Sequence, residues 1–114
     1  MRLRTREVEI FIDVLSPHLG GAPAALYLFG SRTRDTAKGG DIDLLLLSGP
    51  GAISILKDRK PFILADFKKG VGDRRIDLTL TQPKQAQKDP FLRIIFKTAI
   101  LLKKWRGRRS PMTR

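Results

Sequence analysis

Apolar side chains recur along this chain with two different spacings, one typical of helices and the other of strands. Over residues 5–19 they return every three or four positions, and Pro17 with the glycine pair after this segment ends the expected helix. Shorter apolar runs over 24–29, 41–48 and 74–81 predict strands. The second run is apolar on both faces beyond its start, as expected of a central strand.

The remaining segments predict further helices. Residues 52–69 are expected to form two short helices, because Pro61 suits the first turn of the second one. After the third strand a polar linker leads to Asp89-Pro90, a cap followed by proline, which begins a last helix over 90–104. Apolar side chains occupy more than one stripe of that helix. We therefore expect it to dock on another chain, and burial within its own domain is the alternative.

These expectations describe one domain of the α/β (α+β) class, a small mixed sheet of three or more strands with helices packed on it. With 114 residues, the chain is long enough for a single core of modest size. We expect the domain to span residues 1–104 and a basic C-terminal tail to span 105–114.

Two aspartates stand where the second strand begins, shortly after a glycine and a serine. Asp41 and Asp43 are two residues apart, so they share one face of the strand while the residue between them faces the core. Gly30 and Ser31 follow the first strand, and Ser31 can cap a short helix towards Ala37 that returns the chain to the carboxylates. Either motif alone is common in turns or at polar strand edges, but their spacing predicts a site.

Gly30-Ser31-Arg32-Thr33-Arg34 and Asp41-Ile42-Asp43-Leu44 together resemble the signature of the DNA polymerase beta superfamily of nucleotidyltransferases. The third carboxylate of that family is matched by Asp77 on the third expected strand. Nearly all of the chain is covered, so it looks like a minimal nucleotidyltransferase with the nucleotidyltransferase fold. Asp35 stands where many relatives have glycine, and Gly40 stands where many have serine, which removes a hydroxyl that could brace Asp41.

The resemblance implies an enzyme that uses magnesium and a nucleoside triphosphate, with AMP transfer from ATP as our interpretation. Two magnesium ions are expected with bound nucleotide. The implied catalytic residues and magnesium ligands are Asp41, Asp43 and Asp77. Backbone amides at Gly30 and Ser31 are expected to hold the β- and γ-phosphates. Arg32 and Arg34 are candidates for further phosphate contacts.

Composition excludes several other kinds of site. The chain has no cysteine and a single histidine, so it can form neither a disulfide framework nor a zinc cluster. No apolar stretch approaches membrane-spanning length and no signal-type segment follows the first residues, which favours a cytoplasmic protein.

Residues 1–6 and 103–114 hold nine basic side chains and no acidic one, and the net charge is +12. Such ends can bind nucleic acid or an acidic partner, and solvated termini are the alternative.

Three functions are open at this point. Minimal nucleotidyltransferases of this family are often paired with a small helical HEPN-type protein, as antitoxins that adenylylate a ribonuclease toxin. The resemblance thus implies a hydroxyl of such a partner as acceptor, with the last helix as the docking surface for it or for a second copy of the chain. The second function is a catalytically silent interaction or nucleic-acid-binding module, which would have no use for self-repelling carboxylates. The third is a small-molecule nucleotidyltransferase of the antibiotic-modifying type, with an acceptor pocket supplied by a partner subunit.

Overall fold

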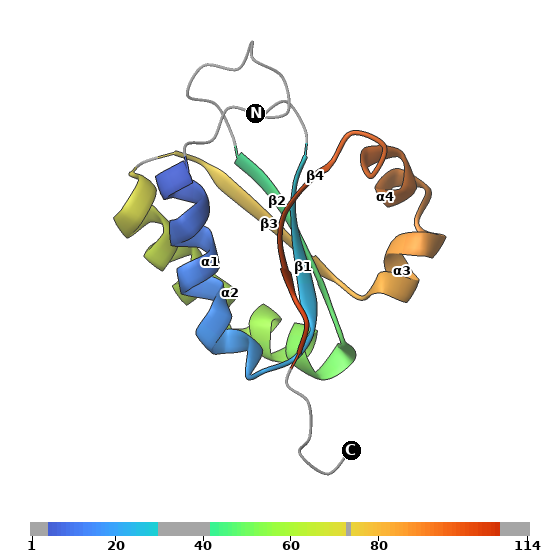
Figure 1. The fold of residues 1–114 in the computed structure, drawn as a ribbon, viewed down its shortest axis with the longest axis horizontal. Helices are drawn as coiled ribbons and strands as arrows, with labels where there is room; N and C mark the ends of the chain where they lie inside the picture. The colour runs from blue at the N-terminus through green and yellow to red at the C-terminus, as the bar shows by residue number, and fades with distance from the viewer. Residues whose placement is uncertain (1–4, 30–41, 73, 108–114) are drawn as a thin grey trace.

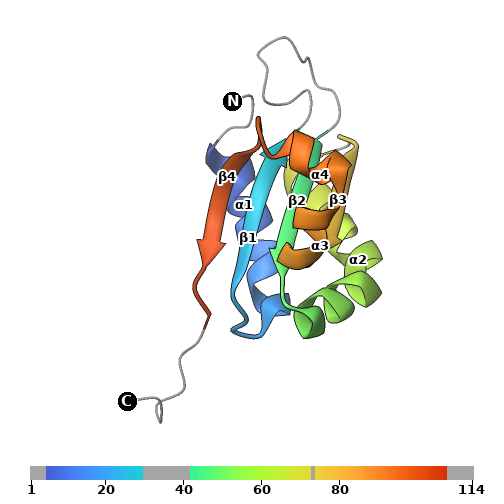
Figure 2. The same ribbon diagram turned by 90° about the vertical axis from the view of Figure 1, so that its right-hand side faces the viewer.

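The computed structural model describes residues 5–29, 42–72 and 74–107. Within these ranges, one four-stranded sheet lies between two layers of helices (Figures 1 and 2). Its strands are β1 (Ala24–Phe29), β2 (Ile42–Ser48), β3 (Ile76–Thr81) and β4 (Ile100–Trp105). One face is covered by helices α1 (Thr5–Leu19) and α2 (Pro50–Val71), and the other by α3 (Pro83–Lys88) and α4 (Pro90–Ile95). The predicted class, a small mixed sheet with helices packed on it, is confirmed.

The sheet combines parallel and antiparallel strands in the order β3-β2-β1-β4. β1 is antiparallel to both of its neighbours, β2 and β4, whereas β2 and β3 are parallel. A parallel pair needs a long crossover connection, and the 22-residue helix α2 provides it. β2 and β3 therefore begin at the same end of the sheet, and β2 is a central strand as its sequence predicts.

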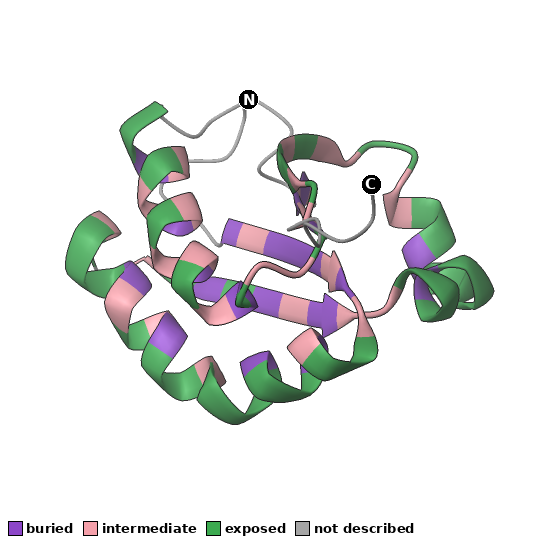
Figure 3. Ribbon diagram, turned by 60° about the horizontal axis from the view of Figure 1, so that its bottom comes forward, coloured by how far each residue is buried: buried purple, intermediate pink, exposed green. Residues whose placement is uncertain are grey.

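Alternation along the strands divides the apolar side chains between two clusters. Leu26, Leu44 and Leu78 are buried towards α1 and α2, where they pack with Phe11 and Phe67. The two phenylalanine rings meet edge to face with their centroids 4.9 Å apart. The smaller cluster, on the opposite face, is formed by Leu45, Ala86 and Leu92. Figure 3 shows the corresponding pattern, with buried residues on the inner sides of the helices and exposed residues on their outer sides.

Helix α2 is continuous from Pro50 to Val71, so the prediction of two short helices over 52–69 was wrong. Pro61 lies inside the helix and is exposed. A proline removes one N–H donor and leaves the carbonyl four residues earlier without its partner. On an exposed face water can bond that carbonyl, and the burial of Ile63 and Phe67 holds the second half of the helix against the sheet.

The prediction of a last helix over 90–104 was also wrong. α4 ends at Ile95, and residues 100–105 form the strand β4 against β1. Pairing satisfies the main-chain donors and acceptors along this edge of β1, which a helix would leave without partners. The apolar helix expected as a docking surface is therefore absent, since its second half belongs to the sheet.

Trp105 joins β4 to α1. Its indole Nε1 donates a hydrogen bond to Ser16 Oγ at 3.0 Å, and Ser16 Oγ donates to the carbonyl oxygen of Ile12 at 2.7 Å. The indole ring also packs against the larger apolar cluster. The end of the described chain is thus held to its first helix.

Two further segments complete the comparison with the sequence. The short helix α3 occupies the segment that was expected to be a polar linker, and it buries Ala86. The short helix expected after Ser31 lies outside the described residues. Among the described helices, none combines the length and apolar character needed to cross a membrane.

Candidate active site

Two acidic side chains project from neighbouring strands at one end of the sheet. Asp43 is the second residue of β2, Asp77 is the second residue of β3, and the two are register partners. Partners in register point to the same face, and adjacent strands lie about 4.8 Å apart. The adjacent Ile42 and Ile76 are buried in the cluster next to α1 and α2, so both aspartates lie on the α3–α4 face. Asp43 is half-buried and Asp77 is exposed, which leaves the pair open to solvent.

The main chain holds these two strand starts together. The amide of Ile42 donates a hydrogen bond to the carbonyl oxygen of Arg75 at 2.8 Å, one residue ahead of β3. The register then continues without interruption to the pair Leu47 and Thr81. Aspartate is unfavourable in strands, and like charges opposite each other weaken strand pairing. The pairing of β2 with β3 is therefore stabilised by the buried apolar residues on either side of the two aspartates.

An ion pair fixes the start of β3 from the other face of the sheet. Arg74 Nη1 lies 2.9 Å from Glu7 Oε2, and the two side chains are 28% and 12% exposed. The atoms are close enough for an ion pair, although their alignment is not that of a hydrogen bond. The pair ties the first turn of α1 to the residue before Arg75. Sequence position alone shows Arg74 only as one of several basic residues at the turn before Asp77.

An aromatic side chain continues the row of carboxylates across the sheet. Phe29 on β1 is the register partner of Asp43, so Asp77, Asp43 and Phe29 stand side by side on one face. Phe29 is half-buried and packs on the smaller cluster, where the rings of Tyr27 and Phe96 meet with centroids 5.0 Å apart. Sequence reasoning did not single out Phe29; the available signal was its position directly before the glycine-serine pair. The carboxylates thus have an apolar wall on one side.

The predicted phosphate-binding segment and one of the three predicted carboxylates lie outside the part of the chain that the structure describes. The predicted site residues that lie outside the described residues are Gly30, Ser31, Arg32, Arg34 and Asp41. Asp43 and Asp77 are the predicted site residues that the structure describes, and it brings them together. Over residues 5–29, 42–72 and 74–107, no group of three or more acidic or histidine side chains could hold a metal ion. The donor type of the described pair, carboxylate oxygen, is the one that magnesium prefers.

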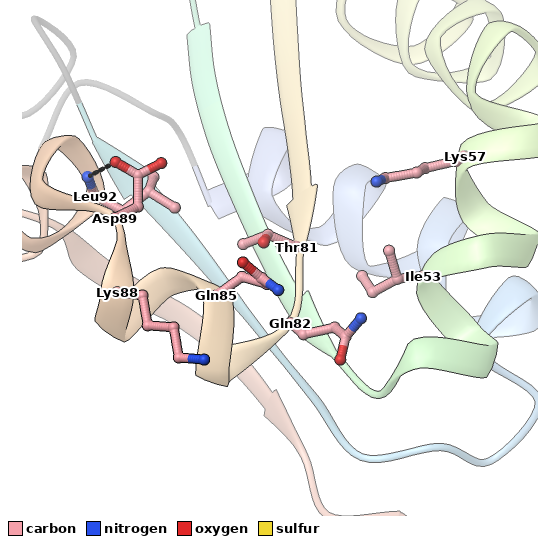
Figure 4. Close-up of a pocket in the computed structure, with 8 residues that line it drawn as sticks. All are labelled: Ile53, Lys57, Thr81, Gln82, Gln85, Lys88, Asp89 and Leu92. Atoms are coloured by element: carbon pink, nitrogen blue, oxygen red, sulfur yellow. Dashed lines mark hydrogen bonds between the residues drawn. The ribbon is translucent and has the colours of Figure 1, made fainter.

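A polar cavity of about 550 Å³ lies near the other end of β3 (Figure 4). It is lined by residues of α2, of the end of β3, of α3 and of the start of α4, namely Ile53, Lys57, Thr81, Gln82, Gln85, Lys88, Asp89 and Leu92. Asp77 and Thr81 are four residues apart on one strand, a rise of roughly 13 Å. The cavity is therefore separate from the carboxylate pair.

The structure thus places two carboxylates side by side at the start of two parallel strands of a mixed sheet. A model of the nucleotidyltransferase domain family matches residues 8–102. This match spans most of the 114 residues, so the chain belongs to the nucleotidyltransferase family, of the DNA polymerase beta type. Proteins of this family transfer a nucleoside monophosphate from a nucleoside triphosphate and generally use a divalent metal. A search of the curated proteins found no match to the chain.

Proposed function

We propose that this chain is a minimal nucleotidyltransferase that moves AMP from ATP, with magnesium, to a hydroxyl group of an acceptor protein. The observation that carries the proposal is the register pairing of Asp43 with Asp77 on an open face of the sheet. The family match supports the reaction class, since it spans both of these residues. ATP as donor, magnesium as metal and a protein as acceptor are the parts that this proposal adds.

The carboxylates are the proposed magnesium ligands. Asp43 and Asp77 supply oxygen donors from adjacent strands. Asp41 stands two positions before Asp43, a spacing that places two side chains on the same face of a strand. Magnesium bound there would lower the pKa of the attacking hydroxyl and stabilise charge on the leaving pyrophosphate. Asp77, the exposed member of the pair, accepts the proton of the attacking hydroxyl.

The segment between β1 and β2 is proposed to bind the triphosphate. Glycine at position 30 lets the main chain approach the phosphates closely, and the Ser31 hydroxyl adds a donor. Arg32 and Arg34 are the proposed cationic contacts to the phosphate oxygens. Phe29 stands directly before this segment and beside Asp43, so the nucleotide and the carboxylates meet next to an apolar wall.

The proposed acceptor is a hydroxyl side chain of a small helical partner of the HEPN type, which makes the chain the antitoxin of such a pair. The resemblance to minimal nucleotidyltransferases supports this assignment. A second support is apolar surface near the site, because Phe91 and Ile94 on α4 are each 64% exposed. We assign to this apolar surface of α4 the docking role that the sequence predicted for a longer helix over 90–104.

Isothermal titration calorimetry tests the nucleotide site. ATP, GTP, CTP and UTP are titrated with magnesium into the native chain, into Asp41→Asn/Asp43→Asn, and into Asp58→Asn, which removes an exposed carboxylate on α2. We expect magnesium-dependent binding, tightest for ATP, in the native chain and in Asp58→Asn, and its loss in the double variant. If the native chain binds no triphosphate in the presence of magnesium, the proposal is wrong for this chain.

Mass spectrometry tests the acceptor. The native chain is incubated with ATP, magnesium and a HEPN-type protein, and the partner is examined for an added AMP on a hydroxyl side chain. We expect this addition with the native chain and none with Asp77→Asn. If nucleotide binds but only an RNA end or a small molecule is modified, the protein acceptor is wrong while the reaction class stands.

A further inference from the structure

Strand β3 presents a polar strip that leads away from the carboxylate pair. Asp77, Thr79 and Thr81 share the α3–α4 face of the strand, and each is exposed or half-buried while the residues between them are buried. β3 is an edge strand, and no further strand pairs with it within the described residues. Alternate main-chain N–H and C=O groups of an edge strand point outwards and can pair with an added strand.

The polar strip ends at the 550 Å³ cavity, which carries two cationic side chains. Figure 4 shows Lys57 reaching towards the cavity from α2, with Lys88 on the opposite side, on α3. The acidic lining residue, Asp89, is already engaged: its Oδ1 accepts hydrogen bonds from the amides of Phe91 and Leu92 at 2.9 and 3.4 Å. Its carboxylate stays charged, but the two lysines outnumber it, so the cavity favours an anionic group, and Gln82 and Gln85 add amide hydrogen-bond donors.

The two ends of the polar strip have the spacing of side chains four positions apart in an extended peptide. In an extended peptide, residues four positions apart project to the same face and lie roughly 13 Å apart, which is the separation of Asp77 and Thr81 along β3. A peptide lying beside β3 with one side chain at Asp77 would thus place the side chain four positions away at the cavity.

Resting on the proposed function, we propose that the acceptor protein docks an acidic extended segment along the outer edge of β3. Its hydroxyl residue lies at Asp77, and a glutamate or aspartate four positions away lies between Lys57 and Lys88. Main-chain pairing supplies affinity, and the spacing between hydroxyl and acid supplies specificity. A nucleic-acid strand has no N–H donors along its backbone, so the edge of β3 favours a peptide over a polynucleotide.

Synthetic peptides test the spacing directly. Each fluorescent peptide contains one tyrosine and one glutamate in a Thr/Val-rich context, with the glutamate two, three or four positions from the tyrosine, on either side. Binding is measured by fluorescence anisotropy with and without magnesium and a non-hydrolysable ATP analogue. We expect a four-residue spacing, in one chain direction, to bind about tenfold more tightly than the others, with or without nucleotide. Two further peptides are N-methylated on every second main-chain amide, one on the odd-numbered and one on the even-numbered positions. The preference is expected to be lost in one of them, because only one set of amides faces β3.

Matched charge reversals test the cavity. In Lys57→Glu/Lys88→Glu the preference for the four-residue spacing is expected to disappear. Lys97→Glu, an exposed lysine that does not line this cavity, is expected to keep the preference. Equal binding of all spacings by the native chain, or an unchanged preference in the double variant, would overturn the proposal. So would a single-stranded oligonucleotide that displaces the peptide from this site in the native chain but not in the double variant. Calorimetry with ATP separates these outcomes from failure of the nucleotide site, because peptide preference is read without nucleotide as well.

Discussion

Asp43 and Asp77 are register partners across the parallel pair β2–β3, each one residue inside the start of its strand. They are more than thirty positions apart in the sequence, and the crossover helix α2 between their strands brings them onto one face. Two like charges in such positions do not stabilise a sheet. In the proposed function, a cation bound together with nucleotide would offset this repulsion.

Asp77→Asn is expected to remove most of the stabilisation that bound ATP gives to the folded chain. A ligand present at about 100 times its Kd stabilises the folded state by about 2.7 kcal/mol, which raises Tm by roughly 10 °C in a domain of this size. We expect ATP with magnesium to produce this shift in the native chain, and expect most of it to be lost in Asp77→Asn. The measurement is thermal unfolding with ATP and magnesium, with Asp58→Asn as the control. A full shift in Asp77→Asn would show that its carboxylate takes no part in metal binding.

Removal of the metal is expected to have the same effect as removal of the carboxylate. Excess EDTA should abolish the ATP-dependent Tm shift of the native chain. Without a cation, the negatively charged carboxylates repel the negatively charged phosphates. Without nucleotide, EDTA should leave Tm nearly unchanged, since the core on the α1–α2 face contains no metal-ligating cluster among its described residues. An ATP shift that survives EDTA would place the nucleotide elsewhere.

The Glu7–Arg74 ion pair is expected to contribute to stability through the start of β3. Because both side chains are largely buried, removing one partner leaves the other charge partly desolvated. We expect Arg74→Met to cost about 1–3 kcal/mol in the free energy of unfolding. A double-mutant cycle with Glu7→Gln, measured by urea unfolding, should show a coupling of about 0.5–3 kcal/mol. Additive effects would mean that the two residues act independently.

The aromatic pair between α1 and α2 is expected to dominate the core. Phe67 is fully buried against Phe11, so Phe67→Ala should lower the free energy of unfolding by about 3–5 kcal/mol. Phe62 on the same helix is 71% exposed, and Phe62→Ala should change it by no more than about 0.5 kcal/mol. Chemical unfolding of the two variants compares them directly. A large effect at Phe62 would indicate that its ring is covered in solution.

Trp105 reports on the docking of β4, because it is the single tryptophan of the chain. Ser16→Ala removes the hydroxyl that accepts its indole N–H and should cost about 0.5–1.5 kcal/mol. Trp105→Phe should cost a similar amount or more, and combining it with Ser16→Ala should add less than the sum of the two. Tryptophan fluorescence and far-UV circular dichroism should report one unfolding transition for the native chain. A separate earlier transition in fluorescence would mean that β4 detaches before the rest.

Several elements were predictable because short-range patterns determine them. The spacing of Phe11, Leu15 and Leu19 defines the buried side of α1, and period-two alternation defines the buried faces of β1 and β3. The same period predicts that Asp41 shares a face with Asp43, and because Asp41 lies outside the described residues this stays a prediction. The family match supports the resemblance that these motifs carried.

Pro61 and the run Ile100-Leu101-Leu102 show where local pattern was insufficient. Whether a proline ends a helix depends on whether the freed carbonyl meets water or protein, and the exposure of Pro61 exists only once α2 has packed. Whether three apolar residues continue a helix depends on a distant partner. Here the open edge of β1 accepts them as a strand.

The amino-acid sequence alone thus specified the helix α1, the first three strands and the identity of the candidate carboxylates, because each follows from spacing within a few residues. The pairing of Asp43 with Asp77, the ion pair of Arg74 with Glu7 and the strand β4 required the folded chain. Each depends on contacts between segments far apart in sequence, where burial and main-chain hydrogen bonding outweigh local preference.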